Sequence, residues 1–200
     1  LPEQVDLYQI GGFCPILEED AVVWADVVDA AAERGATISI DINVRDKLIA
    51  DEAGYRARLS QFLDKAHLVK LSDEDHAWLE PGRSVEDHAA ALLARPHCEL
   101  VVVTMGEEGS RAFSRASSAA APIYAPEVFG DTVGAGDSLM AGILTWLEEA
   151  GALKPGALAA LDASQLQAML RFGAVVAGIN CSRIGCQPPS RAEVNAVLAD

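Results

Sequence analysis

The sequence has 200 residues, of which 50% are hydrophobic and 22% charged, a composition that supports a buried core and does not indicate disorder. Fifteen basic and 30 acidic residues give a formal net charge of −15, which disfavours binding to nucleic acids and to anionic membrane surfaces. A polyanionic ligand such as ATP would need its charge met locally, by a metal ion, a helix N-terminus or individual basic side chains.

Short apolar runs alternate with amphipathic stretches along the first half of the chain. We expect strands at 7–10, 37–40, 67–71 and 100–104, and helices at 19–34, 54–65 and 85–95. Strands that alternate with helices at this spacing form βαβ units, because parallel neighbours need a crossover connection. The fold class is therefore α/β with a mainly parallel sheet, and we expect residues 1–200 to form a single domain.

The pattern changes after Thr104. Two shorter strands are predicted at 111–115 and 121–125, and the brief Ala/Ser run at 116–121 resembles a linker. Three helices are then expected, at 134–150, 163–180 and 190–199, the last after a Pro-Pro pair.

The cysteines and the first residues of the chain indicate the cellular compartment in which the protein is located. The cysteines form no CxxC pair and have no His at zinc-ligand spacing, so we expect free thiols at Cys14, Cys98, Cys181 and Cys186. No stretch is long enough to span a membrane, and residues 1–10 lack the features of a signal peptide. These features predict a cytoplasmic protein.

The segment DTVGAGDSLMAGIL, residues 131–144, carries the most chemical information. Gly134, Ala135 and Gly136 open a helix whose first backbone N–H groups have no intrahelical partner, and the glycines let an anion approach them. A carboxylate at Asp137 would lie beside a bound phosphoryl group and could accept a proton from an attacking hydroxyl. The same spacing also fits a tight turn in which Asp137 only caps the helix.

This segment resembles, nearly residue for residue, the C-terminal signature of the ribokinase/PfkB sugar kinases, in which GAGD forms an anion hole and its Asp is the catalytic base. The resemblance implies a ribokinase-like three-layer α/β/α fold and the ATP-dependent phosphorylation of a sugar hydroxyl. Asp137 would be the general base, the helix N-terminus at 134–137 the anion hole, and Thr132 a nucleotide contact.

Two further segments resemble nucleotide-binding parts of the family. Thr104, Gly106 and Gly109 match its TxGxxG turn, which borders the ATP phosphates; alone, the pattern is an ordinary turn after a strand. Asn180 lies in a segment similar to the one that closes the family's adenine site and, in many members, binds a monovalent cation such as K⁺. An Asn at a helix C-terminus is also a common cap.

The segment Asp41-Ile-Asn43-Val-Arg45 resembles the DxNxR segment of fructokinase-like members. The resemblance makes Asn43 and Arg45 candidates for substrate binding, because a guanidinium offers a fork of donors to a phosphate or sugar oxygen. An exposed surface Arg is the alternative.

Ser72 and Asp75 occupy the place of the family's NxxE motif, which helps to hold Mg²⁺ through water. The pattern here is SxxD, which departs from the family. These residues could equally form the acidic first turn of a following helix.

The resemblance extends from the strand at 7–10 to the terminal helix. Family members carry roughly another hundred residues upstream, which a typical domain size accommodates, and these hold the first strands, the β-sheet lid and residues that grip the sugar. We expect that portion to be absent from this chain. A fructokinase-like enzyme is the first hypothesis, with a sugar and ATP as ligands and a homodimer as one assembly of the intact protein. A 2-keto-3-deoxygluconate kinase and a truncated, non-catalytic nucleotide-binding remnant are the alternatives.

A hydrolase is a different hypothesis, because residues 136–139 spell GDSL. A serine nucleophile needs a His base within hydrogen-bond reach, and in GDSL hydrolases that His follows in a C-terminal DxxH motif. No His follows His97 in this sequence, so the hydrolase hypothesis is disfavoured.

Overall fold

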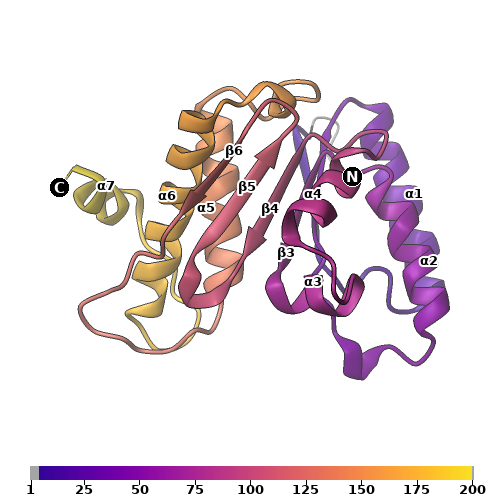
Figure 1. The fold of residues 1–200 in the computed structure, drawn as a ribbon, viewed down its shortest axis with the longest axis horizontal. Coiled ribbons are helices and arrows are strands. Elements are labelled where there is room, and N and C mark those ends of the chain that lie inside the picture. Colours follow the sequence, from indigo (N-terminus) through magenta and orange to yellow (C-terminus); the bar gives the residue numbers. More distant parts are fainter. Residues whose placement is uncertain (1–4, 200) are drawn as a thin grey trace.

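The computed structural model describes residues 5–199, so the first four residues of the segment judged above for a signal peptide lie outside it. A six-stranded mixed sheet in the order β1-β2-β3-β4-β5-β6 forms the centre, with helices on both faces (Figure 1). The strands are β1 (Leu7–Ile10), β2 (Thr37–Asp41), β3 (Leu68–Ser72), β4 (Leu100–Thr104), β5 (Ser110–Ser114) and β6 (Ser118–Ala121).

The helices follow the predicted order, and the predicted bounds are correct to within two residues. They are α1 (Glu18–Glu33), α2 (Glu52–Leu63), α3 (Asp73–Leu79), α4 (Val85–Leu93), α5 (Ala135–Glu149), α6 (Ala163–Cys181) and α7 (Arg191–Ala199), with 3₁₀ turns η1 (Asp46–Leu48), η2 (Gly106–Glu108) and η3 (Leu158–Ala160). The separate helix α3 was foreseen only as an alternative interpretation of the acidic cluster. Within residues 5–199, none of the helices combines the length and apolarity that a membrane crossing requires.

The first four strands are parallel neighbours. Helix α1 connects β1 to β2, α2 connects β2 to β3, and α3 and α4 connect β3 to β4. The predicted βαβ organisation is therefore confirmed. Because the strands are parallel, the carboxyl ends of β2, β3 and β4 all reach the same edge of the sheet.

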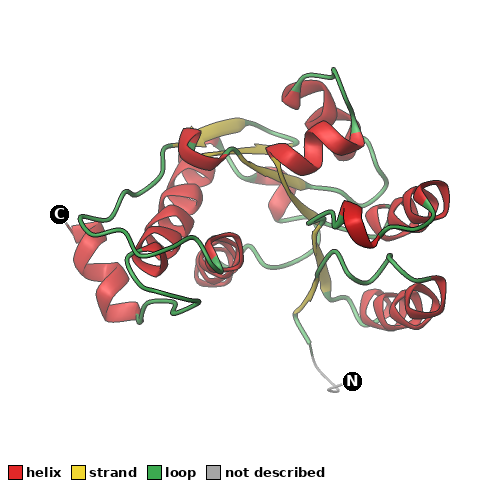
Figure 2. Cartoon of the chain, turned by 90° about the horizontal axis from the view of Figure 1, so that it is seen from below, coloured by secondary structure: helices red, strands yellow, loops and turns green. Residues whose placement is uncertain are grey.

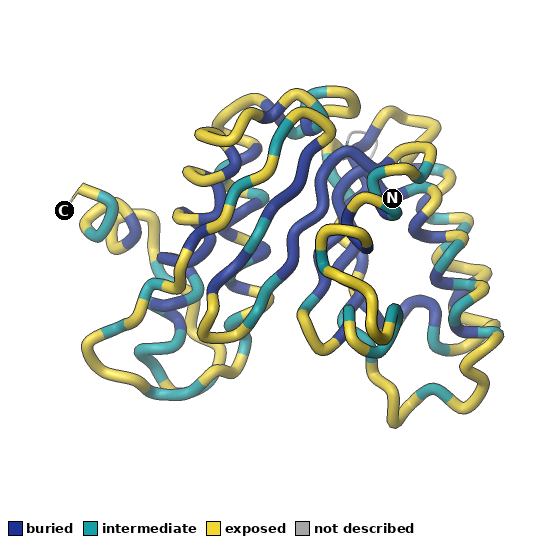
Figure 3. The backbone as a smooth tube through the Cα atoms, viewed as in Figure 1, coloured by how far each residue is buried: buried dark blue, intermediate teal, exposed yellow. Residues whose placement is uncertain are grey.

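Both faces of the central strands are buried. In β4, Leu100 and Val102 pack with α5, α6 and η3, whereas Val101 and Val103 pack with α1, α2 and α4. The strands form a buried band between the helices (Figure 3), and the view from below shows helices on both sides of the strands (Figure 2). A sheet that is apolar on both faces needs a helical layer on each, which gives the three-layer α/β/α architecture.

The predicted strand at 121–125 is wrong. Strand β5 pairs antiparallel with β4, and β6 pairs antiparallel with β5 over Ser118–Ala121, the stretch that was expected to be a linker. The last pair of this ladder joins Ser110 to Ala121. Pro122 follows immediately and has no N–H to donate, so the ladder ends there.

Helices α5 and α6 approach each other closely at two glycines. A Cβ atom placed on Gly142 would lie 2.9 Å from Gly173 Cα and 3.1 Å from Val176 Cγ2, and one on Gly173 would lie 3.0 Å from Leu139 O. The absence of side chains at both positions lets the two backbones touch. This contact fixes α5, and with it the N-terminus of α5, against the rest of the molecule.

We predict that Gly142→Leu destabilises the protein although leucine is the better helix former. The added side chain must push α6 away, and overpacking of this kind costs about 1–3 kcal/mol, which exceeds the gain of about 1 kcal/mol in helix propensity. Ala141→Leu, on the exposed side of the same turn, is the control. Thermal unfolding of both variants checks the prediction, and equal midpoints would contradict it.

Candidate active site

The first turn of α5 lies over the carboxyl ends of β2 and β3. A Cβ atom placed on Gly136 would lie 3.4 Å from Lys70 Nζ, and this ammonium bonds Asp41 Oδ2 at 2.8 Å. Burial raises the pKa of Asp41, Lys70 opposes this shift, and the negative charges of Asp75 and Asp137 add to it. Residues from β2, β3, α3 and α5 therefore share one electrostatic environment.

The N-terminus of α5 presents free backbone donors. Gly134 is the N-cap residue, with φ at +74°, and no side chain caps the helix. Within residues 5–199, no acceptor is found for the N–H groups of Gly136 and Asp137, both of which are exposed. An uncapped helix start with exposed N–H groups is suited to binding an anion.

Gly134 is required by the local geometry. Its left-handed backbone disfavours any side chain, and a Cβ atom there would overlap Cys186 Sγ and lie 2.9 Å from Cys186 Cβ. The turn that opens α5 is therefore packed directly against the chain that follows α6. Asp137, in the first turn of the helix, is exposed.

A cavity of about 560 Å³ adjoins this turn. Four of the five predicted nucleotide contacts, from two separate segments, lie in its wall: Thr104, Gly106, Gly109 and Thr132. The first turn of α5 contributes Ala135 and Gly136, and the apolar part of the wall includes Ile123, Phe129, Leu139 and Ala177. The cavity thus combines an apolar surface with the free donors of a helix N-terminus, as a nucleotide site requires.

The turn after β4 has a glycine where it meets the neighbouring strand. Gly109 has φ at +90°, and a Cβ atom on it would overlap Ala121 O at the end of β6. The N–H of Met105 donates to Gly109 O at 2.8 Å and closes the turn. Thr104 and Gly106, at the two sides of this closed turn, both line the cavity.

Asn180 does not line the cavity; it holds the loop before α5 in place. The side chain is fully buried, and its Nδ2 donates to Val133 O at 2.8 Å while its Oδ1 accepts the N–H of Gln187 at 2.8 Å. Asp131 acts in parallel, accepting the N–H of Val133 at 2.8 Å and that of Gly185 at 2.7 Å. We call these two side chains, Asp131 and Asn180, the loop clamp. Its partners are distant in sequence, and sequence reasoning did not find it.

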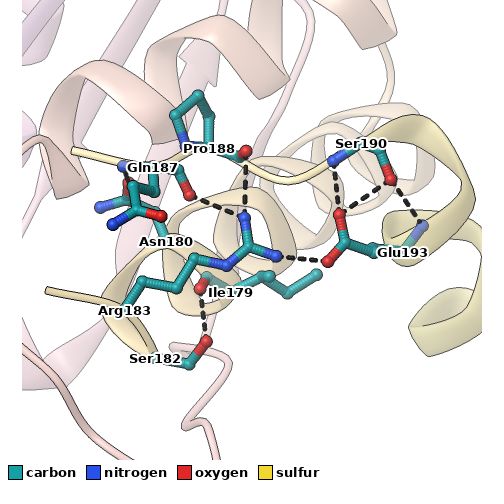
Figure 4. Close-up of polar contacts among 8 residues, drawn as sticks. All are labelled: Ile179, Asn180, Ser182, Arg183, Gln187, Pro188, Ser190 and Glu193. Carbon is teal, nitrogen blue, oxygen red and sulfur yellow. Dashed lines mark hydrogen bonds and ion pairs between the residues drawn. The ribbon is translucent and has the colours of Figure 1, made fainter. Parts of the chain in front are cut away.

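The segment after α6 is itself held by Arg183 (Figure 4). Its guanidinium donates to Gln187 O at 2.9 Å and to Pro188 O at 3.1 Å, and forms an ion pair with Glu193 of α7. Glu193 also accepts the N–H and the hydroxyl of Ser190, each at 2.8 Å. The closing segment is thus fixed at both ends, by the loop clamp and by α7.

Ser72 and Asp75 form a capping box at the start of α3, which confirms the helix-start alternative. The N–H of Asp75 donates to Ser72 Oγ at 3.0 Å, and the N–H of Ser72 donates to Asp75 Oδ2 at 2.8 Å. Asp75 Oδ1 accepts the N–H of Val44 at 2.7 Å, which ties α3 to the chain after β2. The predicted contact with Mg²⁺ through water stays a prediction.

The two candidates for substrate binding lie just beyond β2. Asn43 is half-buried and has φ at +39°, and Arg45 is exposed, with its guanidinium 5.9 Å from the centre of the Phe13 ring. Both residues follow Asp41 at the edge of the sheet that carries the site. Their role in substrate binding stays a prediction.

Lys70 is a site residue that the sequence analysis missed. It is only 6% exposed in the middle of a strand, and a buried Lys is rare unless it is paired. The signal was present in the apolar run His-Leu-Val-Lys-Leu, where a single Lys interrupts a strand that is buried on both faces.

Cys98 and the serine of the GDSL segment are both too buried to act as nucleophiles. All four cysteines are free, as expected, and burial raises the pKa of Cys98 to about 12. Ser138 is 3% exposed inside α5, so it is inaccessible as a nucleophile. In the described part of the chain, no group of three or more His, Cys, Asp or Glu residues is placed to hold a metal ion.

Comparisons with known proteins find fructokinases that are similar to this chain in sequence and in fold. Fructokinase-1 of Oryza sativa subsp. japonica is 27% identical over 197 residues, which are 98% of this chain and 59% of the rice protein. A fructokinase from Xylella fastidiosa with bound ATP superposes with a TM-score of 0.87 at 23% identity, over 97% of this chain and 61% of that one. A fructokinase double mutant from Vibrio cholerae O395, bound to fructose, ADP and potassium, superposes with a TM-score of 0.79 at 19% identity. The match covers 95% of this chain and 59% of that one.

This chain spans between 53% and 59% of the length of the first four curated relatives. The structural matches, which are below 25% identity, establish the ribokinase-type fold. The pfkB family carbohydrate kinases match residues 1–193, and the chain belongs to that family.

Proposed function

We propose that the chain supplies the nucleotide-binding and phosphoryl-transfer side of a kinase that uses ATP to phosphorylate a sugar hydroxyl, with fructose as the first candidate. One observation carries the proposal: Asp137 and the free N–H groups of the first turn of α5 lie beside a cavity of about 560 Å³ lined by four predicted nucleotide contacts. The names of the relatives, among them fructokinases with bound ATP and with bound fructose, support the choice of ligands.

The cavity accounts for nucleotide binding in two parts. Phe129, Ile123 and Leu139 offer apolar surface to the base, while Thr104 and the two glycines after it face the phosphate chain from the β4 side. The first turn of α5 receives the terminal phosphate, since its unbonded N–H groups and the helix dipole favour negative charge. The chain's charge of −15 makes this local arrangement necessary.

Asp137 acts as the general base in the proposed reaction. Its carboxylate takes the proton of the sugar hydroxyl as the hydroxyl oxygen attacks the γ-phosphorus in line, and ADP leaves. The N–H groups of Gly136 and Asp137 stabilise the charge on the transferring phosphoryl group. Asn43 and Arg45, at the same edge of the sheet, are proposed to contact the sugar or its phosphate.

Ser72 and Asp75 would hold Mg²⁺ through water, and the ion would neutralise part of the charge of the nucleotide phosphates. The donor set fits a metal ion that keeps most of its waters. Both carboxylate oxygens of Asp75 already accept backbone N–H groups, at 2.7 and 2.8 Å, so Asp75 would orient a bound water rather than coordinate directly. Ser72 would assist through the same capping box.

We predict that Asp137→Asn in the complete enzyme lowers kcat by roughly 10²–10⁴, the usual loss for a missing general base, and leaves ATP affinity little changed. Asn preserves the size of the side chain and cannot take the proton. Glu148→Gln, at the exposed far end of the same helix, is the control. Coupled measurement of ADP release decides the question, with fructose and 2-keto-3-deoxygluconate assayed in parallel; a normal kcat for Asp137→Asn would remove this residue from the mechanism.

We also predict that Gly134→Val weakens ATP binding and catalysis together, because a branched side chain disrupts the turn and blocks the approach to the N-terminus of α5. Gly151→Val is a matched control: Gly151 also has a positive φ, +66°, but a Cβ atom there meets nothing within 4 Å. Both variants carry backbone strain, and only Gly134→Val disturbs the phosphate site. Calorimetric ATP affinities test this difference, and unchanged affinity in a folded Gly134→Val protein would place the phosphates elsewhere.

A further inference from the structure

Lys70 and Asp41 form an ion pair inside the sheet. They are register partners on β3 and β2, their side chains are each 7% exposed, and the ammonium lies 2.8 Å from Asp41 Oδ2. Removing two charges from water is expensive, and replacing such a pair by apolar residues is often neutral or stabilising. A buried pair of this kind is therefore weak evidence for a purely structural role.

The hydrogen bonding of the pair is incomplete. Within residues 5–199, Asp41 is the only acceptor found for the Lys70 ammonium, which has three donors. Asp41 Oδ1 is buried and has no hydrogen-bond partner at all. A fully satisfied polar network rigidifies a core, whereas a partly satisfied one costs free energy. The pair retains unused donors and an unused acceptor at the edge of the sheet that carries the site.

The position of the ammonium is also unfavourable for the helix above it. Lys70 Nζ would lie 3.4 Å from a Cβ atom on Gly136, so it sits directly under the first turn of α5. The N-terminus of a helix already carries partial positive charge, and a cation there opposes the helix dipole. The repulsion between the Lys70 ammonium and the positive end of the helix dipole is offset when an anion binds at the first turn of α5.

Charges of both signs surround this position. Asp41 balances one unit of charge, and the carboxylates of Asp75 and Asp137 are near enough to act on Asp41. A site that must hold a phosphoryl group next to the negatively charged Asp137 needs a compensating cation. Among the described residues around the first turn of α5, the buried basic side chain is that of Lys70.

We propose that Lys70, held by Asp41, is a positioning residue for phosphoryl transfer. Its ammonium adds a fixed positive charge beneath the first turn of α5 and so favours the terminal phosphate of ATP at that turn. The effect acts through the helix N-terminus, and it is therefore larger for ATP than for ADP, which lacks the terminal phosphate. This inference rests on the proposed function, in which that turn receives the transferred group.

Three variants separate an electrostatic role from a structural one. Lys70→Met removes the charge and keeps the length of the side chain. The double variant Lys70→Met/Asp41→Asn also removes the carboxylate, so no buried charge is left unpaired. Asp41→Asn alone keeps the ammonium and an oxygen acceptor for it. Lys65→Met is the control, because Lys65 pairs with Asp29 and precedes β3, at the opposite end of that strand.

Calorimetric affinities for ATP and for ADP, both with Mg²⁺, are the main readout, after circular dichroism has established that each variant is folded. We expect Lys70→Met and the double variant to lower the ratio of ATP to ADP affinity by about tenfold, as loss of a nearby partly buried charge implies, and to lower kcat by roughly 10- to 100-fold. Lys65→Met should keep the ratio of the unmodified protein, and Asp41→Asn, which leaves the ammonium in place, should not lower that ratio.

A double variant with an unchanged affinity ratio overturns the proposal, and so does Asp41→Asn with the same loss as Lys70→Met, since either result makes the pair merely structural. Failure of the proposed function looks different. An unmodified protein that does not bind ATP, or an Asp137→Asn variant with normal turnover, contradicts the kinase mechanism itself. Intact ATP binding and a large loss in Asp137→Asn, combined with an unchanged ratio in the double variant, contradict only the role of Lys70.

Discussion

The first turn of α5 must be held, uncapped, over the carboxyl ends of the parallel strands, and the rest of the site is arranged around this constraint. The glycine contact between α5 and α6 fixes the axis of the helix. The loop clamp fixes the chain that leads into the helix, because Asn180 and Asp131 both bond the backbone of Val133. With the turn held on both sides, its free N–H groups require no reorganisation when an anion arrives.

Charge is distributed unevenly between this turn and the remainder of the chain. The whole sequence is strongly acidic, with a net charge of −15, and yet the turn combines a helix N-terminus with the ammonium of Lys70 beneath it. Asp137 stands at the same place, so the proposed base and the proposed anion-binding surface adjoin each other. This juxtaposition matches a reaction in which a proton is removed next to a highly charged leaving group.

Much of the fold could be predicted from the sequence, because strand and helix periodicities differ and the connections are short. The position of β6 could not be predicted from its composition: Ser118–Ala121 has little β propensity and pairs because β5 lies beside it. The candidate site was predicted from its local motif at 134–137, and the Thr104 turn from its order in the chain. The loop clamp was not found, because Asp131 reaches Gly185 across 54 positions and no local pattern records such a contact.

The pairing of Lys70 with Asp41 could not be predicted from the sequence, for a different reason. Each could be seen as a charge in an apolar strand, but their pairing depends on the register of β2 against β3. Asp75 was predicted from its motif as a contact to a metal ion. In the structure its carboxylate accepts hydrogen bonds from the backbone N–H groups of Ser72 and Val44. Family motifs indicate which residues belong to the candidate site, whereas the hydrogen bonds and ion pairs of each residue can be read only from the structure.

The loop clamp also has a consequence for the order in which the molecule is built. Its two arms connect the loop before α5 with residues 180–187, at separations of 47 and 54 positions. A chain that emerges from the ribosome from its amino end can pair β1 to β6 well before these late residues are available. The first turn of α5 is thus among the last parts to acquire its shape, and a nascent chain halted before residue 187 carries the motif without the contacts that hold it in place.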